Sequence, residues 1–95
     1  RKTVYINQLR TTPRHGSLAI ASADKIHNLS KMVAGIEAHG PTFLKSFTTD
    51  LEEILWYQQS VHDTLSARWK HPILAAHRRE LEAFVAATAD LQPTP

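Results

Sequence analysis

Residues that could take part in chemistry gather in one short run, Ala23-Asp24-Lys25-Ile26-His27-Asn28. If the run is helical, Asn28 lies one turn beyond Asp24, and His27 flanks Asp24 three residues along the chain. Lys31 continues the same polar face, opposite an apolar stripe. An isolated carboxylate in a buried place is costly unless it is paired or binds a metal. A buried Asp24 would therefore predict a cation beside it.

The same run has a plainer interpretation as a solvated helix face, on which charged side chains pair three and four residues apart. Periodicity alone favours this interpretation over a site. A single carboxylate cannot hold a catalytic metal, which typically needs three or more protein ligands. The six histidines do not complete such a set, because no two of them stand at i and i+4 or in another metal-binding pattern.

The helix that must position these residues is expected from Ser17 to Gly40. Its core face carries side chains at the spacing of an amphipathic helix; these are Leu18, Ser22, Ile26, Leu29, Val33 and Ile36. Ile20 and Ala21 make the first half of the helix apolar nearly all round, which predicts a central helix packed on two sides. Asp24 and Asn28 would then point into a cleft.

Further periodic segments predict helices over residues 1–10, 41–46, 49–70 and 72–91, with a loop over 11–16. Their expected core positions are Val4, Tyr5, Leu9, Phe43, Leu44, Phe47, Leu51, Ile54, Leu55, Gln58, Val61, Leu65, Trp69, Leu74, His77, Leu81, Phe84, Val85 and Leu91. His77 stands on an apolar stripe and is expected to be a hydrogen-bonded core histidine. No segment alternates as a strand, so we predict an all-α single domain of four to five helices over residues 1–95, with a frayed tail at 92–95.

Helix ends are marked by capping residues. Ser17 is the expected N-cap of the central helix, Gly40 its left-handed C-terminal residue, and Pro41 the first position of the next helix. Thr49 and Glu52 read as a capping box, in which the Thr49 side chain caps the helix and Glu52 reaches back.

Composition narrows the classes of protein. An apolar fraction of 42% and a charged fraction of 21% are typical of a globular chain. The net charge of +2 is too small and too dispersed for a nucleic-acid partner. No apolar run reaches the ~18–20 residues of a membrane span, and there is no cysteine and no signal-peptide pattern. We therefore expect a cytoplasmic protein that binds neither nucleic acid nor membrane. Because the sequence opens in mid-pattern with Arg1-Lys2, we also expect a fragment.

The hexad resembles the last metal-ligand motif of HD-domain phosphohydrolases, in the branch similar to the RelA/SpoT-type guanosine tetraphosphate (ppGpp) hydrolases. The family pattern there is Ala-Asp-Lys/Arg-Leu-His-Asn on a core helix. Further likenesses follow in order along nearly the whole chain: Arg1-Lys2-x-x-Tyr5-x-x-x-Leu9, His39-Gly40, Phe47, Leu55-Trp56-Tyr57 and His71-Pro72. The resemblance implies the C-terminal part of an HD-domain helical bundle.

The resemblance also implies roles for residues that match the motif. Asp24 would be the final carboxylate ligand of a divalent metal, commonly Mn²⁺, and Asn28 would contact the sugar of a nucleotide such as (p)ppGpp. His27 and Lys31 would support this turn of helix from behind the ligands. The implied chemistry is attack of a metal-activated water on a phosphate ester or pyrophosphate.

The sequence also departs from the family. The histidine and the His-Asp pair that precede this motif are absent, since His15 is followed by Gly16. His62-Asp63 follows Asp24 in the wrong order, and we expect it to lie on the surface. Three of the four expected ligands are missing, so we expect the chain alone to be inactive and to bind no metal.

Two hypotheses for function follow. In the first, the chain is the C-terminal portion of a metal-dependent phosphohydrolase. In the alternative, it is a non-catalytic helical interaction or regulatory module of HD-like descent. In either case an exposed apolar helix face would favour a homodimer.

Overall fold

The computed structural model describes residues 2–45 and 50–89, and within these ranges the chain forms five helices and no strand. The prediction of an all-α fold with four to five helices is confirmed. The helices are α1 (Lys2–Thr11), α2 (His15–His39), α3 (Pro41–Leu44), α4 (Leu51–Arg68) and α5 (Ile73–Ala89).

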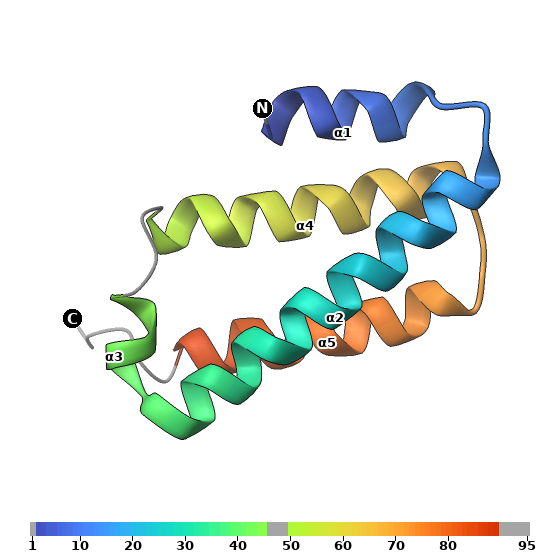
Figure 1. Cartoon of the computed structure of the whole chain (residues 1–95). Helices are drawn as coiled ribbons and strands as arrows, with labels where there is room; N and C mark the ends of the chain where they lie inside the picture. The colour runs from blue at the N-terminus through green and yellow to red at the C-terminus, as the bar shows by residue number, and fades with distance from the viewer. Residues whose placement is uncertain (1, 46–49, 90–95) are drawn as a thin grey trace.

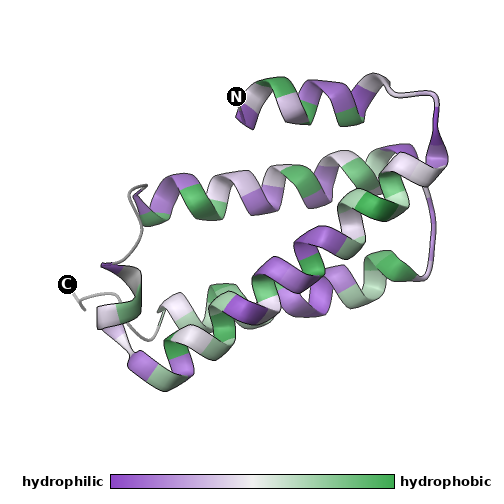
Figure 2. Cartoon of the chain, viewed as in Figure 1, coloured by the Kyte–Doolittle hydropathy of each residue, from purple (hydrophilic) through white to green (hydrophobic). Residues whose placement is uncertain are grey.

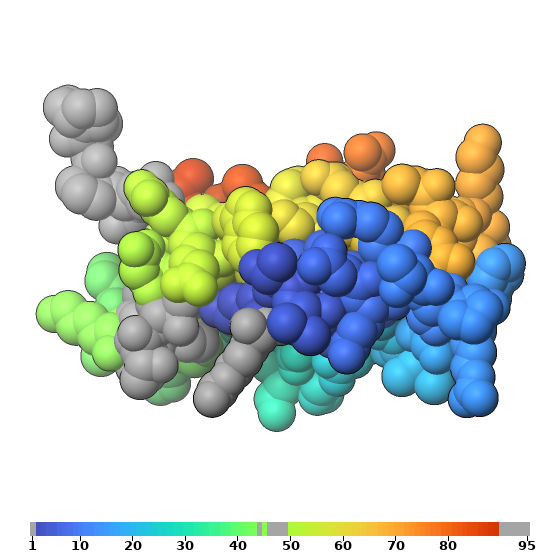
Figure 3. Space-filling model, turned by 90° about the horizontal axis from the view of Figure 1, so that it is seen from above, coloured from blue at the N-terminus to red at the C-terminus, as the bar shows by residue number. Residues whose placement is uncertain are grey.

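The long helix α2 lies mainly against α5, and α4 completes a three-helix bundle with them (Figure 1). The first helix, α1, lies along α4 instead of along α2, to which it is joined (Figure 1). Seen from above, α1 covers part of α4 (Figure 3). The bundle therefore has α1 as an outer layer on one side of α4.

The core consists of two apolar clusters of buried residues. Figure 2 shows hydrophobic segments alternating with hydrophilic ones along the helices. The first contains Ile6, Leu9, Leu18, Ala21, Val61 and Leu65. The second contains Leu29, Ile36, Ile54, Leu81 and Phe84. The buried polar residues of α2, α4 and α5 stand near the boundary between the two clusters, except Thr88, which follows Phe84 on α5.

The N-terminal end of α2 differs from the prediction by three residues, nearly one turn, whereas the helix ends at Gly40 as predicted. The helix begins at His15 with Arg14 as its N-cap, and no side chain caps it, so Ser17 is already inside the first turn. Gly40 has the positive φ that was expected, at 61°, but its ψ of −143° lies outside the left-handed helical region. Pro41 occupies the start of α3 as predicted.

The cap of α4 is Asp50, and the prediction that Thr49 caps this helix is wrong. The Asp50 Oδ1 atom accepts a hydrogen bond from the backbone N–H of Glu52 at 2.9 Å. Thr49 itself lies outside the described residues, as do Phe47, Leu91 and the tail at 92–95.

Several apolar side chains that were expected in the core are exposed. Val4 and Val85 lie on the solvent side of α1 and α5, because Ile6 and Phe84 take the inward positions beside them. Ile20 is 73% exposed, whereas the adjacent Ala21 is buried. The first half of α2 is therefore not packed all round, because α1 covers α4 and leaves this side of α2 open.

Candidate functional site

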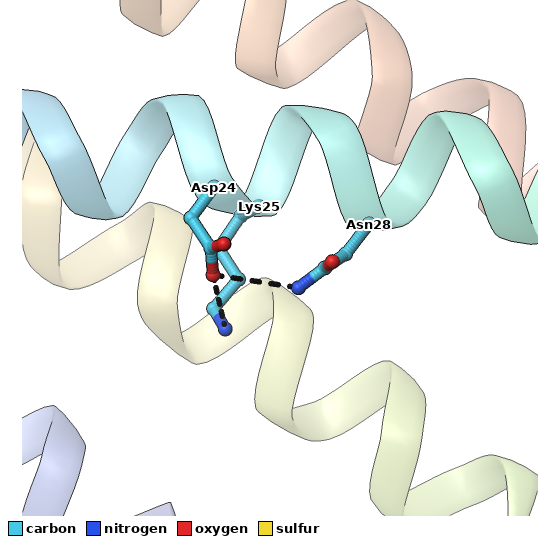
Figure 4. A network of polar contacts seen from close by, with 3 residues as sticks. All are labelled: Asp24, Lys25 and Asn28. Carbon is cyan, nitrogen blue, oxygen red and sulfur yellow. Dashed lines mark hydrogen bonds and ion pairs between the residues drawn. The ribbon is translucent and has the colours of Figure 1, made fainter.

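The Asp24 carboxylate lies on the surface of α2, and its side chain is 58% exposed. Its Oδ2 atom accepts hydrogen bonds from Asn28 Nδ2 at 3.4 Å and from Lys25 Nζ at 3.5 Å (Figure 4). Of the two neighbours predicted for Asp24, Asn28 and His27, Asn28 is therefore in contact with the carboxylate. Because the carboxylate reaches water, the fold does not require a cation to compensate a buried charge.

Lys25, which the sequence did not single out, is the buried member of this group. Only 8% of the residue is exposed, and its Nζ atom lies 5.2 Å from the centre of the Tyr5 ring and 5.1 Å from that of Tyr57. Burial by itself would lower the pKa of Lys25. The hydrogen bond with Tyr57 and the charges of Tyr57, Tyr5 and Asp24 outweigh burial and raise that pKa above its ordinary value.

A signal for this burial is present in the sequence. Besides Ala21, the buried positions of α2 are Leu18, Ser22, Lys25, Leu29 and Ile36; their steps of four, three, four and seven residues keep them on one face of the helix. The expected stripe placed Ile26 and Val33 on this face, but both are only partly buried. A lysine in such a stripe is easily passed over, since its long stem is apolar and its charge normally reaches solvent.

The same cluster attaches α1 to the bundle. The Tyr5 and Tyr57 rings lie 6.3 Å apart in a tilted arrangement, and Lys2 Nζ lies 5.4 Å from the Tyr57 ring centre. Burial is the main cause that raises the pKa of Tyr5. Near the other end of α1, Arg68 Nη1 donates a hydrogen bond to the Leu9 carbonyl oxygen at 2.8 Å.

Asp24 also lines a hollow of about 420 Å³ between α1 and α2. The hollow mixes apolar and polar side chains, and its lining is completed by Tyr5, Gln8, Leu9, Thr12, Ser17, Ile20 and Ala21. The prediction that Asp24 faces a cleft therefore agrees with its position, although the cleft is open to solvent. Asn28, which was expected to face the same cleft, is not among the residues that line this hollow.

The other two residues expected at the site are not brought into contact with it. His27 and Lys31 are both exposed on α2. Within the described part of the chain, neither makes a hydrogen bond or ion pair with Asp24 or Asn28. His27 and Lys31 therefore do not orient the Asp24 carboxylate through a hydrogen bond or ion pair in the described part of the chain.

Among the described residues, Asp24 has no cluster of further metal-binding side chains close enough to share an ion with it. Over residues 2–45 and 50–89, no three His, Cys, Asp or Glu side chains come close enough together to bind one ion. Asp24 therefore stands as a single carboxylate, fewer than the three protein ligands of a typical catalytic metal site. No catalytic step through a metal can be assigned to these residues by themselves.

Two histidines lie in the core. His77 is fully buried, and its Nδ1 atom lies 3.0 Å from Ser22 Oγ, which confirms the prediction of a hydrogen-bonded core histidine. The expectation that His62-Asp63 lies on the surface is wrong for His62, which is buried against α5 with Nε2 3.4 Å from the Leu74 carbonyl oxygen. Only Asp63 is exposed, and its Oδ1 atom accepts a hydrogen bond from Gln59 Nε2 at 3.0 Å.

In comparisons with known proteins, no protein-family model, curated protein or solved structure matches the chain. Across the described residues, none of the helices is both long and apolar enough to cross a membrane.

Proposed function

We propose that this chain contributes part of the active site of a metal-dependent phosphohydrolase, with Asp24 as one ligand of a divalent cation such as Mn²⁺. One observation carries the proposal: an exposed carboxylate lines a hollow, with the Asn28 amide one helical turn away. The family resemblance of the hexad supplies the chemical class. The remaining ligands would come from outside the described residues.

The hydrogen bonds of Asp24 leave one of its carboxylate oxygens available to bind a cation. Both of its hydrogen bonds fall on Oδ2, and among the described residues Oδ1 has no partner. Lys25 would fix the orientation of the carboxylate, because its own position is held by the two tyrosine rings. Asn28 would release Asp24 and donate its amide hydrogens to a nucleotide such as (p)ppGpp.

When bound, the metal would lower the pKa of a coordinated water and neutralise charge on the phosphate. The chain's own contribution is narrower. Asp24 would bind the cation, Asn28 would orient the nucleotide, and the wall of the hollow formed by α1 would limit access of water to one side of the carboxylate. We accordingly expect no hydrolysis by this chain alone.

A second candidate function is a non-catalytic module that binds another helix or a second copy of this chain. Its support is Ile20, a large apolar side chain that is 73% exposed beside the hollow between α1 and α2. A homodimer is expected under either candidate, and sedimentation tests it. Self-association that is lost in Ile20→Glu is the expected result, and a strict monomer would count against a homodimer in both cases.

The proposed metal ligand is tested by titrating Mn²⁺ into isotope-labelled protein and following paramagnetic broadening of its NMR signals. Because a single carboxylate holds no ion stably, the expected result is weak, fast-exchange broadening at high Mn²⁺ concentration, centred on Asp24 and Asn28 and lost in Asp24→Asn. The chain offers a matched control in Asp63, which is also an exposed carboxylate hydrogen-bonded to an amide four residues away, Gln59. Equal broadening around Asp63 would mean that Mn²⁺ senses any surface carboxylate, and the proposal would fail.

A further inference from the structure

Five polar residues form a layer across the middle of the bundle, between the two apolar clusters of the core. We call Ser22, Lys25, Gln58, His62 and His77 the polar layer; none is more than 8% exposed. The layer takes residues from α2, α4 and α5, the three helices of the bundle. Buried polar groups are costly unless each has a hydrogen-bond partner, so the protonation of this layer bears directly on whether the bundle stays closed.

His77 is the most enclosed titratable group of the layer, with no exposed surface. Ser22 Oγ, at 3.0 Å, can pair with only one of its ring nitrogens, Nδ1. The other nitrogen, Nε2, is buried and has no hydrogen-bond partner among residues 2–45 and 50–89. A neutral imidazole carries one N–H, whereas the protonated ring carries two donors. Protonation of His77 therefore creates a buried cation with at least one unpaired N–H.

The groups that face His77 from the other helices make this cation more costly. From α4, the His62 ring stands edge-on to the His77 ring, with 4.8 Å between their centres. From α2, Lys25 places a positive charge on the same layer, and both groups disfavour a charge on His77. Within residues 2–45 and 50–89, the ring therefore has two basic neighbours and one hydroxyl, and no carboxylate acts on it.

We propose that the polar layer is an acid-sensitive latch, which holds α5 against α2 and α4 while His77 is neutral and opens this packing when His77 is protonated. Opening exposes the ring to water, where both N–H groups find acceptors and the charge is solvated. Since α5 makes its principal contact with α2, the loss of the Ser22–His77 contact weakens the largest interface of the bundle. The latch does not depend on the function proposed for Asp24.

The direction and size of the effect follow from linkage. Burial, then the charges of His62 and Lys25, lowers the pKa of His77 from 6.5 to about 4. Because the unfolded chain binds this proton more readily, stability is complete above pH 6.5 and is lost as the pH falls toward 4. The folding equilibrium constant should fall on the order of 100-fold between pH 7 and 4 through this residue alone.

The test compares urea unfolding of the wild-type chain and of His77→Asn at several pH values between 7 and 4. Asn can keep a hydrogen bond with Ser22 but does not titrate. Between pH 7 and 4, the folding equilibrium constant should fall for both proteins, but the fall should be on the order of 100-fold smaller for His77→Asn than for the wild type. His39→Asn, at the exposed end of α2, is the control and should follow the wild type. Identical pH dependence in wild type and His77→Asn would overturn the proposal.

A second measurement keeps the test decisive if His77→Asn does not fold. The ring signals of His77 are followed by NMR in the wild-type chain as the pH is lowered. The latch requires that the ring stays neutral in the folded state and titrates only as hydrogen exchange in α5 accelerates. Titration near pH 6.5, the usual value for histidine, in a fold with unchanged exchange would refute it.

Discussion

Replacing Lys25 with Met tests whether a buried lysine between two aromatic rings stabilises this fold. The Lys25 ammonium faces the rings of Tyr5 and Tyr57 and lies 3.5 Å from Asp24 Oδ2. Met is close to the lysine stem in length and flexibility, and it fills irregular apolar space well. The substitution therefore removes the charge and its interactions while it keeps most of the packing.

The expected loss can be worked from these contacts. A cation over an aromatic face contributes about 0.5–1 kcal/mol at exposed sites and about 2 kcal/mol when desolvated. Lys25 is 8% exposed and faces two rings, while its partner Asp24 is 58% exposed, so that ion pair adds little. After the cost of burying the ammonium is subtracted, we expect Lys25→Met to lower the free energy of unfolding by about 1–3 kcal/mol. At about 4–8 °C per kcal/mol, this corresponds to a drop of roughly 4–24 °C in Tm.

Urea and thermal unfolding followed by circular dichroism measure this loss. Lys31→Met is the matched control, because Lys31 is an exposed lysine on the same helix. It should change the free energy of unfolding by less than about 0.5 kcal/mol. If Lys25→Met is as stable as the wild type or more so, desolvation of the ammonium outweighs its contacts with Tyr5 and Tyr57. The reasoning that the cluster attaches α1 would then be refuted.

Two further predictions concern packing. Gly35→Ala should destabilise the fold by about 1–3 kcal/mol in thermal melts, although alanine has the better helix propensity. The reason is that the added Cβ would overlap the Phe43 ring. In Gly16→Ala, the control, the added Cβ meets nothing within 4 Å, so this variant should be neutral or stabilising in the same melts. Phe84→Ala should cost about 3–5 kcal/mol in urea unfolding, since Phe84 is fully buried, whereas the adjacent and exposed Val85→Ala should cost less than about 0.5 kcal/mol. Equal effects of the two members of either pair would contradict the packing described here.

The sequence alone determined the helices and much of their inward faces. The apolar residues of α2, α4 and α5 recur at 3.6-residue spacing, and Pro and Gly mark most of the breaks, so local rules suffice. The placement of His77 in the core was predictable for the same reason, since Leu74 and Leu81, three and four residues away, are apolar. The proximity of Asp24 and Asn28 also followed from helix geometry, because side chains four residues apart on a helix are neighbours whatever surrounds them.

Only the tertiary structure decided that Lys25 and His62 are buried. Lys25 is enclosed because rings from α1 and α4 meet over it, and His62 is buried because α5 packs against its side of α4. Ile20 is exposed for the converse reason, since α1 lies on α4 and not on α2. Periodicity states which residues share a face of one helix, but burial depends on which other helix covers that face, and that is set by contacts between residues far apart in the chain.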